Sequence, residues 1–218
     1  MKKRLVLSLL LLLFLTTITL NQKIIITKFN IKEINIENNI LLSSEEVKKL
    51  LIPIYETNLF FLKYEEVEKA LMKSSLVGSF EIRKKYPNSL EIKIFEKTPI
   101  AIIFHKKKKY FLSENIELIK FEELKYNKSL PFVLGKRDKF ESFYNRLKIN
   151  NFPVDIIKKY TFFETNRWDI ETYDNKIIKL PPVNYINSLE KYLSLKNDSS
   201  VRKYKVFDFR IEKQLILK

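Results

Sequence analysis

The hydrophobic pattern of the chain begins with one uninterrupted apolar stretch and then changes to short amphipathic segments. Leu5 to Leu20 contains no charged residue and follows the basic stub Met1 to Arg4. Sixteen residues in a helix span roughly 24 Å, slightly less than the roughly 30 Å hydrocarbon core of a bilayer. Residues up to Lys23 extend this stretch into the interface. We therefore predict a transmembrane anchor over residues 5–23, represented by Leu5, Leu10, Phe14 and Leu20.

A cleaved secretory signal peptide has a similar start, a basic stub before an apolar run. Such peptides end in small residues resembling Ala-x-Ala, yet the first alanine of this chain is Ala70. An uncleaved anchor is the favoured interpretation, with the signal peptide as the alternative. In both cases the positive-inside bias leaves residues 1–4 in the cytoplasm and exports the rest. We expect a single-pass protein of the cell inner membrane whose bulk is periplasmic.

Residues 27–98 are patterned as a compact α+β unit. Ile34 and Ile36 alternate with polar residues, which predicts a half-buried strand. Ser43 and Glu46 have the spacing of a capping box at a helix start, and a second helix follows with Val67, Ala70 and Leu71 on its buried side. A hairpin comes next, with its turn at Tyr86-Pro87-Asn88. Its predicted inward residues are Ile82, Leu90, Ile92 and Ile94, and its predicted outward residues are Arg83 and Lys93.

The pattern of residues 99–218 predicts a β-rich domain of antiparallel strands with two or more helices. Two strands flank the lysine run 106–109, and a second hairpin turns at Asp174-Asn175. Asp138 and Asn184 are the predicted caps of the two helices. The first of these helices has the apolar face Phe140, Phe143, Tyr144 and Leu147. Two closing strands, Val206 to Arg210 and Leu215 to Leu217, end the pattern, and the predicted fold class is α+β.

Charge and composition change this picture little. The net charge is +15 with a pI near 9.7, but 34 of the 41 basic residues are lysine and they form no arginine-bearing stripe with stacking aromatics. We therefore expect no nucleic-acid partner. Binding of anionic lipid or cell-wall polymer is a secondary possibility for so basic a chain.

The scarcity of reactive residue types argues against an enzyme. The chain has no cysteine, two glycines and the single histidine His105. These counts exclude thiol chemistry, phosphate-binding glycine loops and multi-histidine zinc sites. We expect no catalytic residue, metal, cofactor or small-molecule substrate. Because a pair of catalytic carboxylates needs no motif, an exported hydrolase stays open as a distant alternative.

Several residue strings resemble one bacterial family. Ile34-x-Ile36-x-Asn38-Asn39, Leu42-Ser43-x-Glu45-Glu46-Val47 and Asn58-Leu59-Phe60-x-Leu62 are similar to the opening of the FtsQ/DivIB division proteins. Ile82-Arg83-x-x-Tyr86-Pro87-x-x-Leu90, continuing to Pro99-x-Ala101, is similar to their hairpin and its exit. The resemblance implies a POTRA (polypeptide-transport-associated) domain over residues 27–98. Asn38 and Thr57 stand where the family usually has glycine, so we expect the loop at Thr57 to differ.

The resemblance also implies a function, a partner surface and a location. It implies a non-enzymatic scaffold that links early and late division proteins at the septum and docks FtsB/FtsL-type partners and other divisome members. A terminal strand at a sheet edge exposes backbone groups that a partner segment can pair with. We expect residues 213–218 to form that strand, with Arg210 selecting an acidic partner residue. The predicted partner-binding residues are Arg210, Ile211, Gln214, Leu215, Ile216 and Leu217.

The alternative function is a POTRA-bearing component of protein export or outer-membrane assembly. Such components usually carry several POTRA copies or a membrane barrel. One copy is predicted here, which favours the division scaffold.

Overall fold

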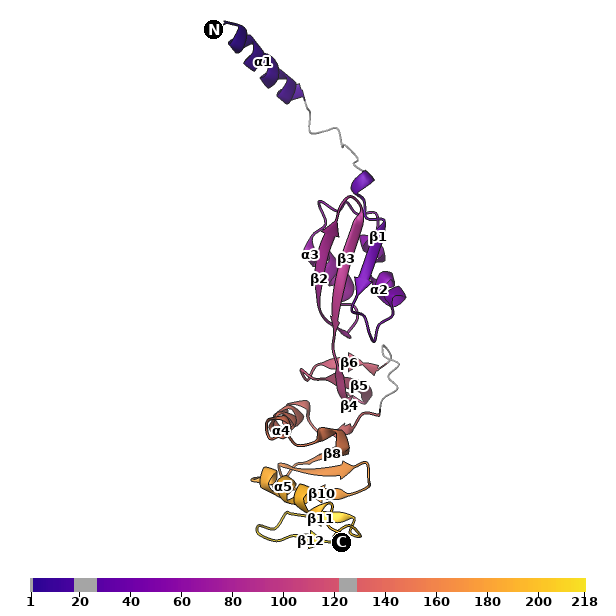
Figure 1. Cartoon of the computed structure of the whole chain (residues 1–218), viewed down its shortest axis with the longest axis vertical. Helices are drawn as coiled ribbons and strands as arrows, with labels where there is room; N and C mark the ends of the chain where they lie inside the picture. The colour runs from indigo at the N-terminus through magenta and orange to yellow at the C-terminus, as the bar shows by residue number, and fades with distance from the viewer. Residues whose placement is uncertain (1, 18–26, 122–128) are drawn as a thin grey trace.

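The computed structural model of the chain describes residues 2–17, 27–121 and 129–218. The N-terminal helix α1 (Lys2–Thr17) is followed by two folded units, which lie one after the other along an elongated molecule (Figure 1). Every apolar side chain from Leu5 to Leu15 is at least 55% exposed, so no described part of the protein covers α1. No helix among the described residues has both the length and the apolar character needed to cross a bilayer. The predicted anchor residue Leu20 lies outside the described residues.

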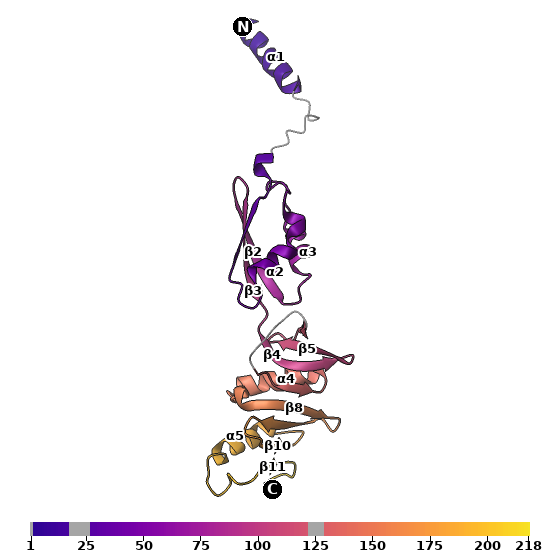
Figure 2. The same ribbon diagram turned by 90° about the vertical axis from the view of Figure 1, so that its right-hand side faces the viewer.

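The first unit has the predicted order of strand, helix, helix, strand, strand. After the short η1 (Thr27–Phe29) it contains β1 (Glu33–Glu37), α2 (Ser44–Leu50), η2 (Ile52–Ile54), α3 (Tyr64–Leu71), β2 (Val77–Lys85) and β3 (Ser89–Glu96). The strand order is β1-β3-β2, with β1 parallel and β2 antiparallel to β3. Both helices lie on one side of the sheet (Figure 2). Apolar residues on the inner phase of β1 and β3 pack against them, and the most buried are Ile34, Leu90, Ile92 and Ile94.

Local signals at the start of α2 form as predicted. The Ser43 side chain accepts from the Glu46 N–H while the Glu46 carboxylate accepts from the Ser43 N–H, which completes the capping box. Asn38 adopts a positive φ of 61° and its amide donates to the Ile94 carbonyl. At the second expected glycine position the positive φ falls on Glu56, at 66°, one residue before Thr57. The β-branched Thr57 thus avoids a conformation that would strain it.

The described residues of the second unit form one nine-stranded sheet with the α-helices α4 and α5. The strand order is β12-β11-β10-β9-β8-β7-β4-β5-β6. The elements are β4 (Pro99–His105), β5 (Lys108–Ser113), β6 (Leu118–Lys120), β7 (Phe132–Leu134), α4 (Arg137–Ile149), η4 (Val154–Ile156), β8 (Ile157–Phe163), β9 (Arg167–Thr172), β10 (Ile177–Lys179), α5 (Tyr185–Leu195), β11 (Val206–Asp208) and β12 (Ile216–Leu217).

One face of this sheet is covered by α4 and α5. A continuous cross-strand row on that face joins seven strands and consists of Ile103, Val133, Tyr160, Ile170, Ile178, Phe207 and Leu217. These residues share one hydrophobic core with Phe140 and Phe143 of α4 and with Leu189 and Tyr192 of α5. Because side chains alternate across a strand, the neighbouring residues of each strand point to the opposite face, on which no helix of residues 129–218 or 99–121 packs.

The prediction of antiparallel strands in the second unit is confirmed for five of its eight neighbouring pairs and is wrong for the other three. Three neighbouring pairs are parallel: β4 with β7, β7 with β8, and β10 with β11. For two of these pairs the cause is the position of the helices, since α4 connects β7 to β8 and α5 connects β10 to β11, whereas β4 reaches β7 through β5 and β6. A helical crossover returns the chain in the same direction, so the strands that it joins are parallel.

The predicted helix caps are also corrected. Helix α4 begins at Arg137 with Lys136 as its N-cap, so Asp138 lies inside the first turn, where a negative charge still favours the helix dipole. Asn184 is the N-cap of α5 but has a left-handed backbone and makes no capping bond through its side chain. The predicted inner face of α4 is confirmed, because Phe140, Phe143, Tyr144 and Leu147 are buried.

The two units are joined by packing as well as by the chain. Phe111 of β5 and Ile119 of β6 are buried in the hydrophobic cluster of the first unit. The Lys120 N–H donates to the Ser75 hydroxyl at 2.8 Å, and Lys97 pairs with Glu117 at 2.7 Å. The junction therefore has an apolar centre and a polar rim.

The hairpin phase can be tested with two adjacent substitutions. Ile92→Ala should lower the free energy of unfolding by about 2–5 kcal/mol, because it leaves a cavity in a fully buried position. Lys93→Ala should change it by less than about 0.5 kcal/mol, because Lys93 is exposed. Denaturant unfolding of both variants measures the difference. Equal losses would contradict the assigned strand phase.

Candidate functional site

The last two strands form one edge of the nine-stranded sheet, at the far end of the molecule from α1 (Figure 1). In β12, Ile216 lies opposite Asp208 and Leu217 opposite Phe207 of β11, in antiparallel register. Within the described residues β12 pairs with no strand on its other side. This confirms the predicted closing strand pair.

The backbone of β12 presents hydrogen-bonding groups to that open side. Lys218 and Val206 exchange two bonds, with the Lys218 N–H donating at 3.1 Å and the Val206 N–H donating at 2.9 Å. Hydrogen-bonded and non-hydrogen-bonded pairs alternate in an antiparallel ladder, so the pair formed by Leu217 and Phe207 is of the non-bonded kind. The N–H and C=O of Leu217 therefore point away from β11.

Arg210 stands beside this edge and is held by Asp208. Its Nε donates to Asp208 Oδ1 at 2.8 Å and its Nη2 to Oδ2 at 2.6 Å, which makes a two-point ion pair. The Arg210 side chain is 40% exposed, whereas that of Asp208 is 6% exposed. Hydrogen bonds from Arg210 lower the pKa of the Asp208 carboxyl, and the same pairing raises the pKa of Arg210. The guanidinium is therefore oriented from within the protein, with further N–H groups left over for a partner.

A row of charges crosses the uncovered sheet face toward this pair. Lys179 of β10 lies between Asp169 of β9 and Asp208 of β11 in the strand register, and Ile216 of β12 ends the row. Burial raises the pKa of the Asp169 carboxyl, against the opposing attraction of Arg167, Lys179 and Arg210. The alternating signs place each charge beside an opposite one.

The structure divides the six predicted partner residues into three groups. Arg210, Ile211 and Gln214 line a groove of about 540 Å³, together with the start of α5 and residues 181–183. Leu215 and Leu217 are half-buried and pack against the core of the second unit. Ile216 is 36% exposed and shares the uncovered face with Asp208. Arg210, Ile211 and Ile216 thus have the exposure that a contact surface needs.

The predicted strand over residues 213–218 is wrong in its extent. Only Ile216–Leu217 is paired as a strand, and Lys213 has a left-handed φ of 62°. The turn at Lys213 reverses the chain so that β12 runs antiparallel to β11. The residues just before Leu215 form this turn and are therefore not part of the strand.

The sequence interpretation missed Asp208, Lys179 and Asp169 as parts of this site. For Asp208 a signal exists, because residues two apart in a strand share a face and Asp208 and Arg210 have that spacing. Lys179 and Asp169 gave no comparable signal, since they lie on other strands and are brought together only by the sheet register.

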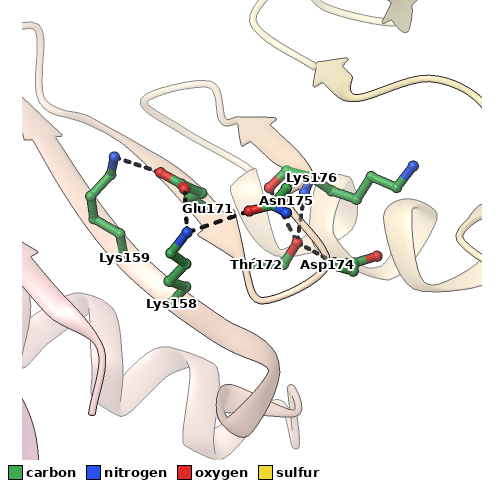
Figure 3. Close-up of polar contacts among 7 residues, drawn as sticks. All are labelled: Lys158, Lys159, Glu171, Thr172, Asp174, Asn175 and Lys176. Atoms are coloured by element: carbon green, nitrogen blue, oxygen red, sulfur yellow. Dashed lines mark hydrogen bonds and ion pairs between the residues drawn. The ribbon is translucent and has the colours of Figure 1, made fainter. Parts of the chain in front are cut away.

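A second polar network fixes the turn between β9 and β10 (Figure 3). Glu171 pairs with Lys159 and, at 3.3 Å, with Lys158. The Thr172 hydroxyl donates to Asp174 and accepts from the Lys176 N–H. The Lys176 ammonium donates to the carbonyls of Arg202 and Tyr204, next to β11. This network ties β8, β9 and the approach to β11 together, so its part is to support the edge.

The described residues contain no candidate metal-binding site. No group of three or more His, Cys, Asp or Glu side chains is placed there to hold an ion. The site therefore offers backbone hydrogen bonds, one oriented guanidinium and exposed isoleucines, which together suit a protein segment.

Comparison with known proteins gives consistent matches. A family model described as a POTRA domain of FtsQ type matches residues 29–97. The cell division protein FtsQ of Rickettsia typhi is 26% identical over 196 residues, covering 84% of this chain and 70% of that protein. The cell division protein DivIB of Clostridium tetani is 26% identical over 111 residues, covering 51% of this chain and 42% of that protein. A solved extracytoplasmic domain of the cell division protein DivIB from Geobacillus stearothermophilus aligns over 51% of this chain and 99% of that chain, with 18% identity and a TM-score of 0.36.

The Glu171 pairs predict a pH dependence of stability. Hydrogen bonding to Lys159 is the main cause that lowers the pKa of Glu171. A lowered carboxyl pKa contributes stability that is complete above the unfolded-state pKa, near 4.5, and is lost as the pH falls through the folded-state value. Glu171→Gln should therefore lower the free energy of unfolding by up to about 1 kcal/mol at pH 7, and this difference from the parent should close on acidification.

Unfolding by urea at several pH values measures that difference. The matched control is Glu164→Gln, which neutralises an exposed carboxylate in the turn between β8 and β9. A gap between the Glu171→Gln variant and the parent that stays constant down to pH 3 would contradict the assignment.

Proposed function

Since the chain belongs to the FtsQ/DivIB family of bacterial cell division proteins, we propose that it acts as a non-enzymatic scaffold of the divisome at the septum. Its relatives are division proteins, which supports a part in the division machinery. The finer proposal is that the second unit docks a periplasmic segment of an FtsB/FtsL-type partner and thereby links early and late division proteins.

The observation that carries this proposal is the open side of β12. The N–H and C=O of Leu217 point outward from the sheet, and β12 is short enough for a partner segment to cover it with one added strand. Main-chain pairing of this kind supplies affinity, and the side chains beside the strand supply selectivity.

Arg210 is the proposed source of that selectivity. The Asp208 carboxylate holds the guanidinium at two points, so little side-chain freedom is lost when a partner binds. Its remaining N–H groups favour an acidic or carbonyl-bearing partner residue through charge-assisted hydrogen bonds. Ile211 and Ile216, which are 51% and 36% exposed, supply apolar contact on either side.

We also propose that α1 is part of a membrane anchor. Its leucines are exposed in every direction, which is the distribution expected of a helix that lipid surrounds. Lys2, Lys3 and Arg4 would remain in the cytoplasm by the positive-inside rule, and both folded units would lie in the periplasm. In this arrangement β12 lies at the end of the protein farthest from the membrane (Figure 1). A partner that extends from the same membrane into the periplasm would meet it there.

Two substitutions test the proposed docking surface. Leu217→Pro removes the outward N–H, which edge strands tolerate, and Arg210→Glu opposes an acidic partner residue. Each should weaken binding of the FtsB/FtsL-type periplasmic segment at least about tenfold, a loss of roughly 1.4 kcal/mol, in a calorimetric titration. The control Arg137→Glu makes the same charge change at an exposed residue at the start of α4, which joins the middle strands β7 and β8, and should bind as the parent does.

Thermal melting separates docking from folding. Both variants should fold but melt below the parent, because Leu217→Pro removes a half-buried side chain and Arg210→Glu leaves the Asp208 carboxylate without its partner. Leu217→Ala loses the same packing but keeps the outward N–H, so it should bind as the parent does. If either Leu217→Pro or Arg210→Glu folds and binds with parental affinity, the partner surface lies elsewhere.

The anchor makes a separate prediction. Intact mass of the protein purified from membranes should show that residues 1–23 are retained, because the apolar stretch is followed by no Ala-x-Ala cleavage signal. A mature species beginning near Asn21 would contradict it.

A further inference from the structure

Three segments of the POTRA domain meet at the end of the domain that faces α1. The Leu59 N–H donates to the Phe29 carbonyl at 2.8 Å, the Ile31 N–H to Thr57 at 3.0 Å and the Lys32 N–H to Asn88 at 2.9 Å. Residues 28–32, 56–63 and 84–88 thereby form one surface, which we call the tip. Both views place the tip at the end of the domain nearest to α1 (Figures 1 and 2).

Aromatic side chains gather on the tip. The ring centroid of Phe60 lies 4.6 Å from that of Phe29 and 4.8 Å from that of Tyr86. These rings are not core residues, since Phe60 is 51% and Tyr86 54% exposed, and the adjacent Phe61 is 79% exposed. Grouped exposed aromatics of this kind mark a surface that contacts something less polar than water.

The charge of the tip indicates what kind of surface it binds. Its three segments carry five lysines and one acidic residue, Glu56. The lysines are Lys28, Lys32, Lys63, Lys84 and Lys85. Lys85 pairs with Glu91 and Lys84 donates to the Leu62 carbonyl, whereas Lys28, Lys32 and Lys63 are exposed at the rim. Exposed aromatics within a basic rim are the combination that binds the interface of an anionic bilayer.

The distance along the chain allows that contact. Nine residues separate α1 from Thr27, and at no more than about 3.6 Å per residue they span at most roughly 35 Å. A helix held in a bilayer would therefore keep the tip close to the same bilayer.

We propose that the tip docks onto the lipid bilayer that holds α1, a proposal that rests on the membrane anchor proposed above. Phe60, Phe61 and Tyr86 insert at the headgroup level, where aromatic rings are favoured. The exposed lysines lie on anionic headgroups. The contact orients the long molecule, so that β12 is presented at a set distance from the membrane.

The absence of cysteine from the chain makes the test direct, because one introduced cysteine carries one spin label. The full chain is reconstituted into vesicles of phosphatidylcholine alone or with anionic phosphatidylglycerol. Labels are placed at Phe61→Cys on the tip, Leu10→Cys in α1 and Ile40→Cys. Ile40 is a matched control, since it is 82% exposed and its N–H binds Glu96 at the opposite end of β3 from the tip.

The readout is the ratio of collisions with oxygen, which partitions into lipid, to collisions with a water-soluble nickel complex. The label at position 61 should give a ratio severalfold above that at position 40, and the excess should grow with phosphatidylglycerol and shrink with added salt. A label at position 61 that matches position 40 in both vesicles, while position 10 reports lipid, would overturn tip docking alone. A label at position 10 that reports water would overturn the anchor and this inference together.

A charge substitution supplies a second measurement. With the label at Tyr86→Cys, Phe61→Glu should lower the collision ratio toward that of the aqueous control, because it places a carboxylate among anionic headgroups. Ile40→Glu makes an equivalent change away from the tip and should leave the ratio unchanged. Equal ratios in the two variants would overturn the proposal.

Discussion

Burial of a single sheet face beneath α4 and α5 is the constraint on which the second unit depends. The core row from Ile103 to Leu217 crosses seven strands on that face, and each helix must cross back over it. These crossovers impose parallel pairing on the strands that they join. They leave β12, added by a short antiparallel turn, as the open edge. The proposed docking strand is thus a consequence of how the core is covered.

Among the described residues no helix covers the other face, and its polar residues are arranged with opposite charges side by side. Lys179 lies between two aspartates in the register, and the second of these, Asp208, holds Arg210. In the ion pair of Asp208 and Arg210, the carboxylate is nearly buried and the guanidinium is partly exposed to solvent. Such a pair contributes little to stability, but it presents a cation in one defined orientation, which is what selective docking requires.

The two folded units carry the two proposed contact surfaces at their opposite ends, the tip toward α1 and β12 at the far end (Figure 1). The tip of the POTRA domain is basic and aromatic, whereas the far edge offers backbone groups and one guanidinium. Between them, burial of Phe111 and Ile119 in the core of the POTRA domain joins the units. Because this packing holds the two units together, a contact made by the tip also restricts the positions that β12 can take.

Local patterns in the sequence determined the phase of the hairpin, the capping box at Ser43 and the position of the closing strand pair. Each depends on residues close together in the chain, and period-two alternation has the same meaning whatever strand lies alongside. Only the tertiary structure decided the parallel pairs, the short extent of β12, the placing of Lys179 and Asp169 beside Asp208 and the meeting of three segments at the tip. Those features depend on which distant segments become neighbours, and for two of the parallel pairs the connecting helices set that choice.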